Sequence, residues 1–273
     1  MDNTKQAIAA TGLLVAAMRA EESVRADALF TDPFAERLAG DEGRKLLAEA
    51  AADTEQPSAP IVVRTRLFDE ALLRVQDDVA QVVILAAGMD ARSYRLPWRD
   101  GTDVYEIDQP QVIAIKEERL AGEHPRCHRV AVGVDLSDDW PKMLQSKGFD
   151  PSSRTVWLIE GLLQYVDAPD VDRLFARVDA LSAPGSVLLY DVVGKTLLAA
   201  PFLASTLRFM EKLGAPWIFG SDNPAALAED RGWTATPTDM AEPGNRWNRW
   251  MHPAIPADVT GAPRGYFVEA IKT

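Results

Sequence analysis

The chain has 273 residues, of which 47% are hydrophobic and 26% are charged, proportions typical of a soluble globular protein. Its 29 basic and 41 acidic residues give a net charge of −12, which argues against nucleic acid and anionic lipid as partners. The single cysteine, Cys127, excludes an internal disulfide and a thiolate metal cluster. Because the three histidines also lack the spacing of a metal site, we predict no bound metal.

The N-terminus has neither the basic start nor the apolar core of a signal peptide. No run of about twenty apolar residues occurs in the chain, so no membrane span is expected. We therefore predict a cytoplasmic protein. The length suits one large domain, or one domain with appended helices, and no feature indicates an oligomeric state.

The first sixty residues predict helices. Apolar side chains recur at helical spacing over residues 4–22. Asp32 and Pro33 are typical of the cap and first position of a second helix, and residues 51–60 read as a loop. Because residues 1–60 are too short for a core of their own, we expect them to form a helical cap or lid on a domain of residues 61–273.

From residue 61 the pattern becomes that of an α/β protein. A helical stripe runs from Phe68 to Val79, further helices are predicted over 110–120 and 170–181, and Ser221–Pro224 and Gly232 mark the start and end of another. Strands are predicted over 82–86, 103–107, 129–134, 155–160, 186–192, 233–238 and 265–272. The alternation favours a parallel sheet covered by helices on both faces, with the last two strands pairing antiparallel at one edge.

Gly88 ends the first apolar strand, and Asp108 ends the next one, twenty positions later. A glycine there lets a ligand approach the backbone, and an acid at the tip of the next strand can accept hydrogen bonds from ribose hydroxyls. The dinucleotide fingerprint needs three glycines, however, and only one is present. The pair therefore indicates a nucleoside-containing ligand without a pyrophosphate, or else a tight turn without a ligand.

Asp135 and Glu160 also end apolar strands, so that with Asp108 three acids face one crevice. Such a set suits a ligand with ribose hydroxyls, an exocyclic amine and a positive charge. Taken one at a time, each acid could equally cap a helix or face solvent. Arg64 precedes the first strand and could bind a ligand carboxylate through a bidentate pair, or could simply be a surface residue.

Two segments, 197–220 and 243–252, are rich in aromatic residues. We interpret the region around 195–250 as an insertion that builds a substrate pocket, although core packing explains such segments equally well. The residues that we assign to this pocket are Arg19, Tyr165, Phe202, Phe209, Trp217 and Trp247.

Six segments match a known family in order along the chain. They are residues 18–34, VRTRLFD at 63–69, LAAGMDARSYRL at 85–96, YEIDQP at 105–110, residues 134–136 and EGLLQYV at 160–166. With these segments the chain resembles the leucine carboxyl methyltransferase family of S-adenosylmethionine-dependent enzymes, in particular its bacterial branch.

The resemblance implies a Rossmann-like, doubly wound sheet of seven mostly parallel strands, as in class I methyltransferases, with the last strand antiparallel. It implies S-adenosylmethionine as cofactor and assigns contacts to its methionine part (Arg64, Gly88), ribose (Asp108), adenine (Asp135, Leu136) and amino or sulfonium end (Glu160). Ala87 is a further predicted cofactor-binding residue. One departure is Ala86, where the family has glycine. Alanine is a mild change there if its φ is negative, and a costly one if φ is positive.

The resemblance also implies the reaction. A carboxylate acceptor is already ionised at pH 7, so in-line methyl transfer to it needs positioning and no general base. We therefore predict O-methylation of a carboxylate on a small molecule or a peptide C-terminus, with no catalytic side chain assigned. Three alternatives remain open: a hydroxyl or phenol acceptor in secondary metabolism, a nicotinamide-dependent dehydrogenase, and a cofactor-binding protein without catalysis.

Overall fold

A sheet of seven strands, in the order β3-β2-β1-β4-β5-β7-β6, organises the computed structural model, which describes residues 3–53, 57–250 and 252–273. The strands are β1 (Gln81–Leu85), β2 (Asp103–Asp108), β3 (His128–Gly133), β4 (Thr155–Ile159), β5 (Val187–Val193), β6 (Trp233–Asp239) and β7 (Gly265–Lys272). Strands β1 to β5 pair in parallel, and β7 runs antiparallel to both β5 and β6. The predicted fold class is confirmed, and each predicted strand lies within one residue of its observed bounds.

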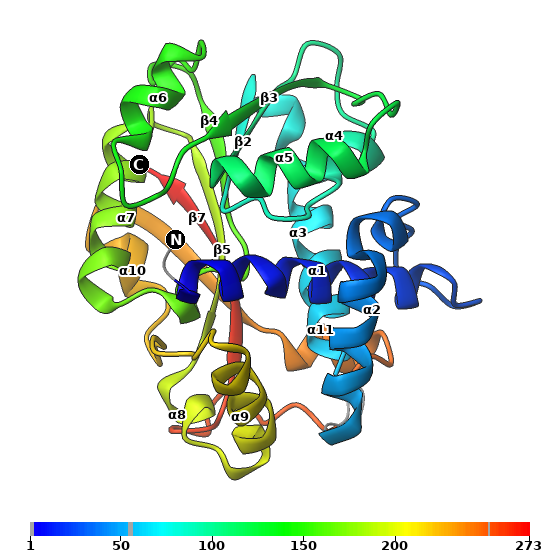
Figure 1. The fold of residues 1–273 in the computed structure, drawn as a ribbon. Coiled ribbons are helices and arrows are strands. Elements are labelled where there is room, and N and C mark those ends of the chain that lie inside the picture. Colours follow the sequence, from blue (N-terminus) through cyan, green and yellow to red (C-terminus); the bar gives the residue numbers. More distant parts are fainter. Residues whose placement is uncertain (1–2, 54–56, 251) are drawn as a thin grey trace.

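Helices cover both faces of this sheet (Figure 1). The helices longer than one turn are α1 (Asn3–Ser23), α2 (Ala35–Asp53), α3 (Ala59–Val75), α5 (Pro110–Arg119), α6 (Trp140–Ser146), α7 (Ala168–Ala180), α9 (Ala204–Leu213) and α11 (Ala241–Arg246). Short helices are α4 (Arg92–Arg95), α8 (Lys195–Leu198), α10 (Ala226–Glu229), η1 (Gln76–Asp78), η2 (Leu163–Tyr165) and η3 (Pro201–Leu203).

The core has one apolar layer on each face of the sheet. On one face Trp140 of α6 and Phe175 of α7 pack with Trp157 and Tyr190 of the strands, and all four side chains are buried. On the other face Phe68 of α3 meets Phe267 of β7 edge to face. Because both faces are covered, the central strands are apolar at nearly every position, as the sequence shows.

Four element boundaries differ from the sequence prediction. The helical stripe expected to reach Val79 ends with α3 at Val75, and Val79 is extended after η1. Asp32 does not cap the second helix directly: its carboxylate accepts the Phe34 N–H in a turn, and α2 begins only at Ala35. The predicted loop over 51–60 is shorter, since 51–53 continue α2 and α3 begins at Ala59, while 54–56 lie outside the described residues. The helix expected after Pro224 is reduced to α10, four residues long.

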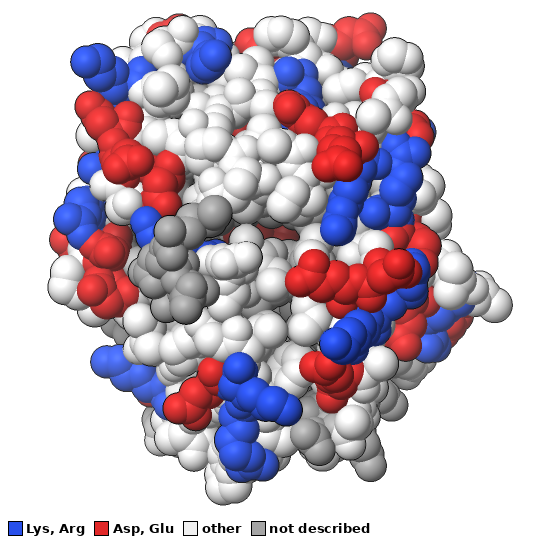
Figure 2. Space-filling model, viewed as in Figure 1, with Lys and Arg blue, Asp and Glu red and all other residues white. Residues whose placement is uncertain are grey.

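Helix α1 runs across the front of the sheet in Figure 1 and packs along α2. It is fixed at its C-terminal half by two buried ion pairs, from Arg19 to Asp32 and from Arg249 to Glu22. Acidic and basic side chains are interspersed on the face that α1 crosses (Figure 2). Among the described residues, no helix combines the length and apolar character needed to cross a membrane.

Candidate functional site

A cleft of about 440 Å³ lies between α1 and the carboxyl ends of β1 to β4. Since β1 has β2 on one side and β4 on the other, this is the point where the chain reverses the direction in which it adds strands, the usual ligand site of such sheets. The cleft brings together nine of the residues predicted from the sequence: Arg19, Arg64, Ala87, Gly88, Asp108, Asp135, Leu136, Glu160 and Tyr165.

The turn after β1 forms one wall of the cleft. Ala86 has φ +54° and Gly88 has φ +43°, so both residues are in the left-handed region. A Cβ at Gly88 would meet only the Ala86 carbonyl oxygen, at 3.9 Å, which means that the space above this glycine is open. The positive φ makes alanine at position 86 a costly departure from the family's glycine, because alanine is strained in this region and glycine is not.

Asp108 is tied to this turn by its carboxylate. It accepts the Gly88 N–H at 2.6 Å and the Gln109 N–H at 2.7 Å. Burial raises the pKa of Asp108, and the two backbone hydrogen bonds oppose that shift. Each carboxylate oxygen keeps a second lone pair, so the group can still accept hydrogen bonds from a ligand.

Asp135, in the loop after β3, links the cleft to the N-terminal half of α1. It accepts Lys5 Nζ at 2.8 Å and both the N–H and the hydroxyl of Ser137. Burial alone would raise the pKa of Asp135, but these hydrogen bonds outweigh it and the pKa is lowered. The neighbouring Leu136 carbonyl accepts Arg177 Nη1 of α7, which fixes the loop from the other side.

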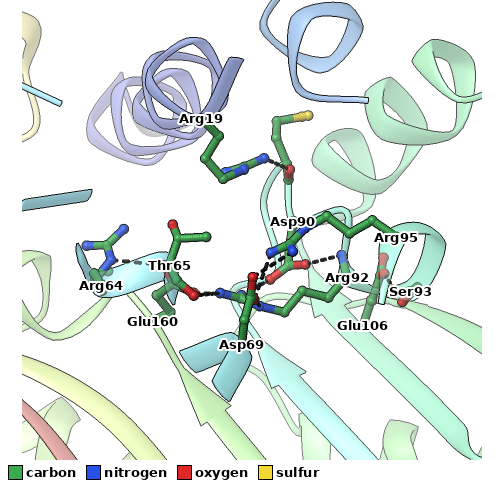
Figure 3. A network of polar contacts seen from close by, with 12 residues as sticks. Arg19, Arg64, Thr65, Asp69, Asp90, Arg92, Ser93, Arg95, Glu106 and Glu160 are labelled. Carbon is green, nitrogen blue, oxygen red and sulfur yellow. Dashed lines mark hydrogen bonds and ion pairs between the residues drawn. The ribbon is translucent and has the colours of Figure 1, made fainter. Parts of the chain in front are cut away.

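A network of buried arginines and carboxylates forms the floor of the cleft (Figure 3). Glu160 joins two of the arginines, because its two oxygens accept Arg64 Nε at 3.0 Å and Arg92 Nη1 at 2.6 Å. Arg92 also pairs with Asp69 and Asp90. Burial would raise the pKa values of Glu160 and Asp90, but the arginines outweigh it and lower both, that of Asp90 to about 2. These acids are therefore held as carboxylates.

Several members of this network were not predicted from the sequence: Asp69 as a cleft partner, Asp90, Arg92, Arg95 and Asp191. Asp191 of β5 accepts Arg64 Nη1 at 3.4 Å. Apart from the local pair of Arg92 with Asp90, the paired residues lie 23 to 127 positions apart along the chain, so spacing gives no clue to the pairing. The available signal is the cluster of charged residues inside the otherwise buried segment 85–96.

Tyr165 and apolar residues line the opposite end of the cleft. Leu162 and Ile218 stand beside Tyr165, and the loop carrying Ile218 is tied to η2 by its N–H bond to the Gln164 carbonyl. Burial raises the pKa of the Tyr165 hydroxyl, which therefore keeps its proton at neutral pH. The hydroxyl is therefore a donor and not a base at neutral pH.

Four of the six residues assigned to a substrate pocket do not line the cleft. Phe202 is 59% exposed and meets His252 edge to face, and Phe209 packs against the cluster between α1 and α2. Trp247 packs on the core layer under α3, while Trp217 stands behind Tyr165. Aromatic content alone does not decide where such residues lie, because packing between helices uses the same side chains as a pocket does.

The described residues contain no group of three His, Cys, Asp or Glu side chains that could hold a metal ion. His124, His128 and His252 are exposed and do not line the cleft. The polar groups that line the described part of the cleft are carboxylates, arginines, Tyr165, Lys5, hydroxyl and amide side chains, and backbone groups.

Comparison with known proteins places the chain in a family. The model of the leucine carboxyl methyltransferase family matches residues 12–179. The chain belongs to this family. A relative from Mycobacteroides abscessus is 38% identical over 268 residues, which cover 91% of this chain and 87% of that protein. One from Mycobacterium tuberculosis H37Rv is 39% identical over 279 residues, covering 89% of each. Both carry the name "Putative S-adenosyl-L-methionine-dependent methyltransferase".

Solved structures with low sequence identity to this chain share its fold. A methyltransferase-like protein from Thermobifida fusca superposes with a TM-score of 0.60 at 17% identity, covering 86% of this chain and 89% of its own. A protein from Streptomyces avermitilis superposes with a TM-score of 0.64 at 12% identity, covering 92% and 98%. These structures show the fold alone, while the family model and the relatives confirm the family expected from the sequence motifs.

Proposed function

We propose that this chain transfers a methyl group from S-adenosylmethionine to a carboxylate oxygen of a small molecule or a peptide C-terminus. The methyl donor follows from the family, because relatives of this chain are named as S-adenosylmethionine-dependent methyltransferases. The observation that supports a carboxylate acceptor is the state of Asp90, Asp135 and Glu160, whose pKa values arginines and hydrogen bonds lower so that they stay ionised. We also propose that the protein acts in the cytoplasm, as the sequence led us to expect.

The residues of the cleft fit this cofactor. The open space above Gly88 admits a ligand against the backbone of the turn, and Asp108 retains lone pairs for ribose hydroxyls. In the proposed arrangement Arg64 meets the carboxylate of the methionine part, and Ala87 lies against the same part. Asp135 and Leu136 meet the adenine, and Glu160 faces the amino or sulfonium end.

Positioning is the main work of the protein in the proposed reaction. When bound, the cofactor supplies a methyl group on a positively charged sulfur. Helix α1 and the residues around Tyr165 close the space beside it and orient the acceptor, which removes most of the entropy cost of bringing two reactants into line. A carboxylate is ionised at neutral pH, so no side chain has to take its proton.

A hydroxyl or phenol acceptor would demand more of the same site. A phenol has a pKa of about 10, so a base must remove its proton during transfer. The carboxylates of Asp90 and Glu160 are poor bases because their pKa values are lowered, and the described cleft lining contains no histidine. This contrast favours the carboxylate.

The test is methyl transfer from cofactor labelled in its methyl group to matched acceptors. We would offer aromatic acids beside phenols of the same ring, and peptides with free beside amidated C-termini. We expect label that mild alkali releases as methanol, the behaviour of a methyl ester. Label that survives alkali as a methyl ether would refute the carboxylate and establish a hydroxyl acceptor instead.

Two variants of strand β2, one test and one matched control, accompany that assay. Asp108→Ala removes a proposed cofactor contact at the carboxyl end of the strand, and we expect it to abolish most of the transfer. Asp103→Ala removes an exposed partner of His128 at the other end of the same strand and should leave transfer unchanged.

A further inference from the structure

Asp191 is a buried carboxylate that the proposed reaction does not use directly. It lies in β5, one residue beyond the last β4–β5 pair of Ile159 with Tyr190, and only 4% of its surface is exposed. It is not among the residues that line the cleft. Its two oxygens have separate partners: Oδ1 accepts the Gly161 N–H at 2.6 Å, and Oδ2 accepts Arg64 Nη1 at 3.4 Å.

Arg64 is therefore held from two sides. Glu160 accepts its Nε at 3.0 Å from the end of β4, and Asp191 accepts its Nη1 from β5. Two carboxylates on adjacent strands define the plane of a guanidinium better than one, because each fixes a different nitrogen of the rigid fork. Burial raises the pKa of Asp191, while the charge of Arg64 and the Gly161 hydrogen bond oppose that shift.

Gly161 leaves the room that this arrangement needs. Its φ is +65°, in the region that favours glycine, and a Cβ placed on it would lie 2.9 Å from Arg64 Nη2 and 3.0 Å from Nη1. Any larger residue at 161 would push the guanidinium aside. The same carboxylate, that of Asp191, thus fixes both the arginine and the glycine turn that passes beside it.

We propose that Asp191 is a positioning residue, which together with Gly161 sets the Arg64 guanidinium at the methionine end of the cofactor site. This inference rests on the proposed function, in which Arg64 meets the cofactor carboxylate. Asp191 itself touches neither cofactor nor acceptor. Its effect is confined to ligands that carry an amino-acid part.

The test compares two nucleosides that differ only in that part. S-adenosylhomocysteine carries the amino-acid carboxylate, whereas 5′-methylthioadenosine ends at a methyl group on the sulfur. In Asp191→Asn, the remaining oxygen can still accept the Gly161 N–H, but the amide nitrogen faces Arg64. We expect calorimetry to show S-adenosylhomocysteine bound about tenfold more weakly, the loss typical of one charge-assisted hydrogen bond, with 5′-methylthioadenosine unchanged.

Asp239→Asn is a matched control, because Asp239 has the same pattern of partners. Its Oδ1 accepts the Ala241 N–H and its Oδ2 accepts Arg264 Nη1, yet neither residue of this pair lines the cleft. We expect both nucleosides to bind this variant as they bind the wild type. Gly161→Ala should reproduce the selective loss seen in Asp191→Asn.

The outcomes separate the two claims. An equal loss for both nucleosides in Asp191→Asn would overturn the positioning role, since it would show a general structural defect. Unchanged affinity for S-adenosylhomocysteine would overturn it as well. Wild-type protein that bound neither nucleoside would overturn the proposed function, and the positioning role with it.

Discussion

Replacement of Glu106 by glutamine probes the charges buried beneath the cofactor cleft. The Glu106 side chain, in β2, has no exposed surface and accepts Ser93 Oγ at 2.6 Å, Lys116 Nζ at 2.9 Å and Arg129 Nε at 2.9 Å. Lys116 is equally unexposed. The carboxylate therefore joins α4, α5 and β3 to the strand that ends at Asp108.

Glutamine keeps the shape of the side chain but leaves Lys116 buried beside a neutral amide. Removing one partner of a buried ion pair costs about 3–5 kcal/mol. For a chain of this length each kcal/mol lowers the midpoint of thermal unfolding by about 2 °C, so we expect Glu106→Gln to unfold about 6–10 °C earlier. Scanning calorimetry or circular dichroism measures this shift.

Glu117→Gln is the control, because Glu117 meets the same Arg129 at 3.5 Å but is 52% exposed. An exposed pair contributes little, so its unfolding midpoint should move by about 1 °C or less. The reasoning is refuted if the two variants shift equally, or if Glu106→Gln shifts by about 2 °C or less. Burial would raise the pKa of Glu106, but Lys116 and Arg129 lower it, so the wild type loses this contribution as pH falls and the variant has none to lose.

Three more outcomes can be measured. Asp108→Ala leaves the Gly88 and Gln109 N–H groups without their acceptor and removes the proposed ribose contact. Calorimetry should therefore show S-adenosylhomocysteine bound about 5- to 150-fold more weakly than by the wild type. An unchanged affinity would remove Asp108 from the cofactor site. Ala86→Gly removes the strain of a left-handed alanine, which costs about 1–2 kcal/mol, but glycine also adds freedom to the unfolded chain. We expect the free energy of unfolding, measured with denaturant, to rise by about 0.5–1 kcal/mol. A lower free energy of unfolding would show that Ala86 is not strained. The pKa of Asp90 is lowered to about 2, so its contribution is complete above about pH 4 and is lost as pH falls toward 2; unfolding measured over that range should show a shallower fall in Asp90→Asn than in the wild type.

The sheet could be predicted from the sequence because its strands are short, apolar and bounded by polar turns. The residues at the strand ends were found for the same reason: Asp108, Asp135 and Glu160 each follow a largely apolar strand, and parallel strands bring such residues to one edge. The motifs added the order of those strands and the family. Local pattern thus accounts for both the scaffold and the first contacts of the cleft.

The network on the floor of the cleft could not be predicted in the same way. Arg92 reaches Asp69 and Glu160 across 23 and 68 positions, and no periodicity connects residues that far apart. The aromatic residues present a different difficulty. Phe209 and Trp247 give the same sequence signal whether they fill a core or line a pocket. Only the packing of the helices decides between the two.

The contacts of α1 bear on the order in which this protein is completed during synthesis. Glu22 finds its partner in Arg249, 227 positions later, and Lys5 finds one in Asp135. Helix α1 therefore cannot complete its contacts until the segment that carries Arg249 has been synthesised. The position of α1 over the cleft thus depends on an ion pair whose second residue follows 227 positions later.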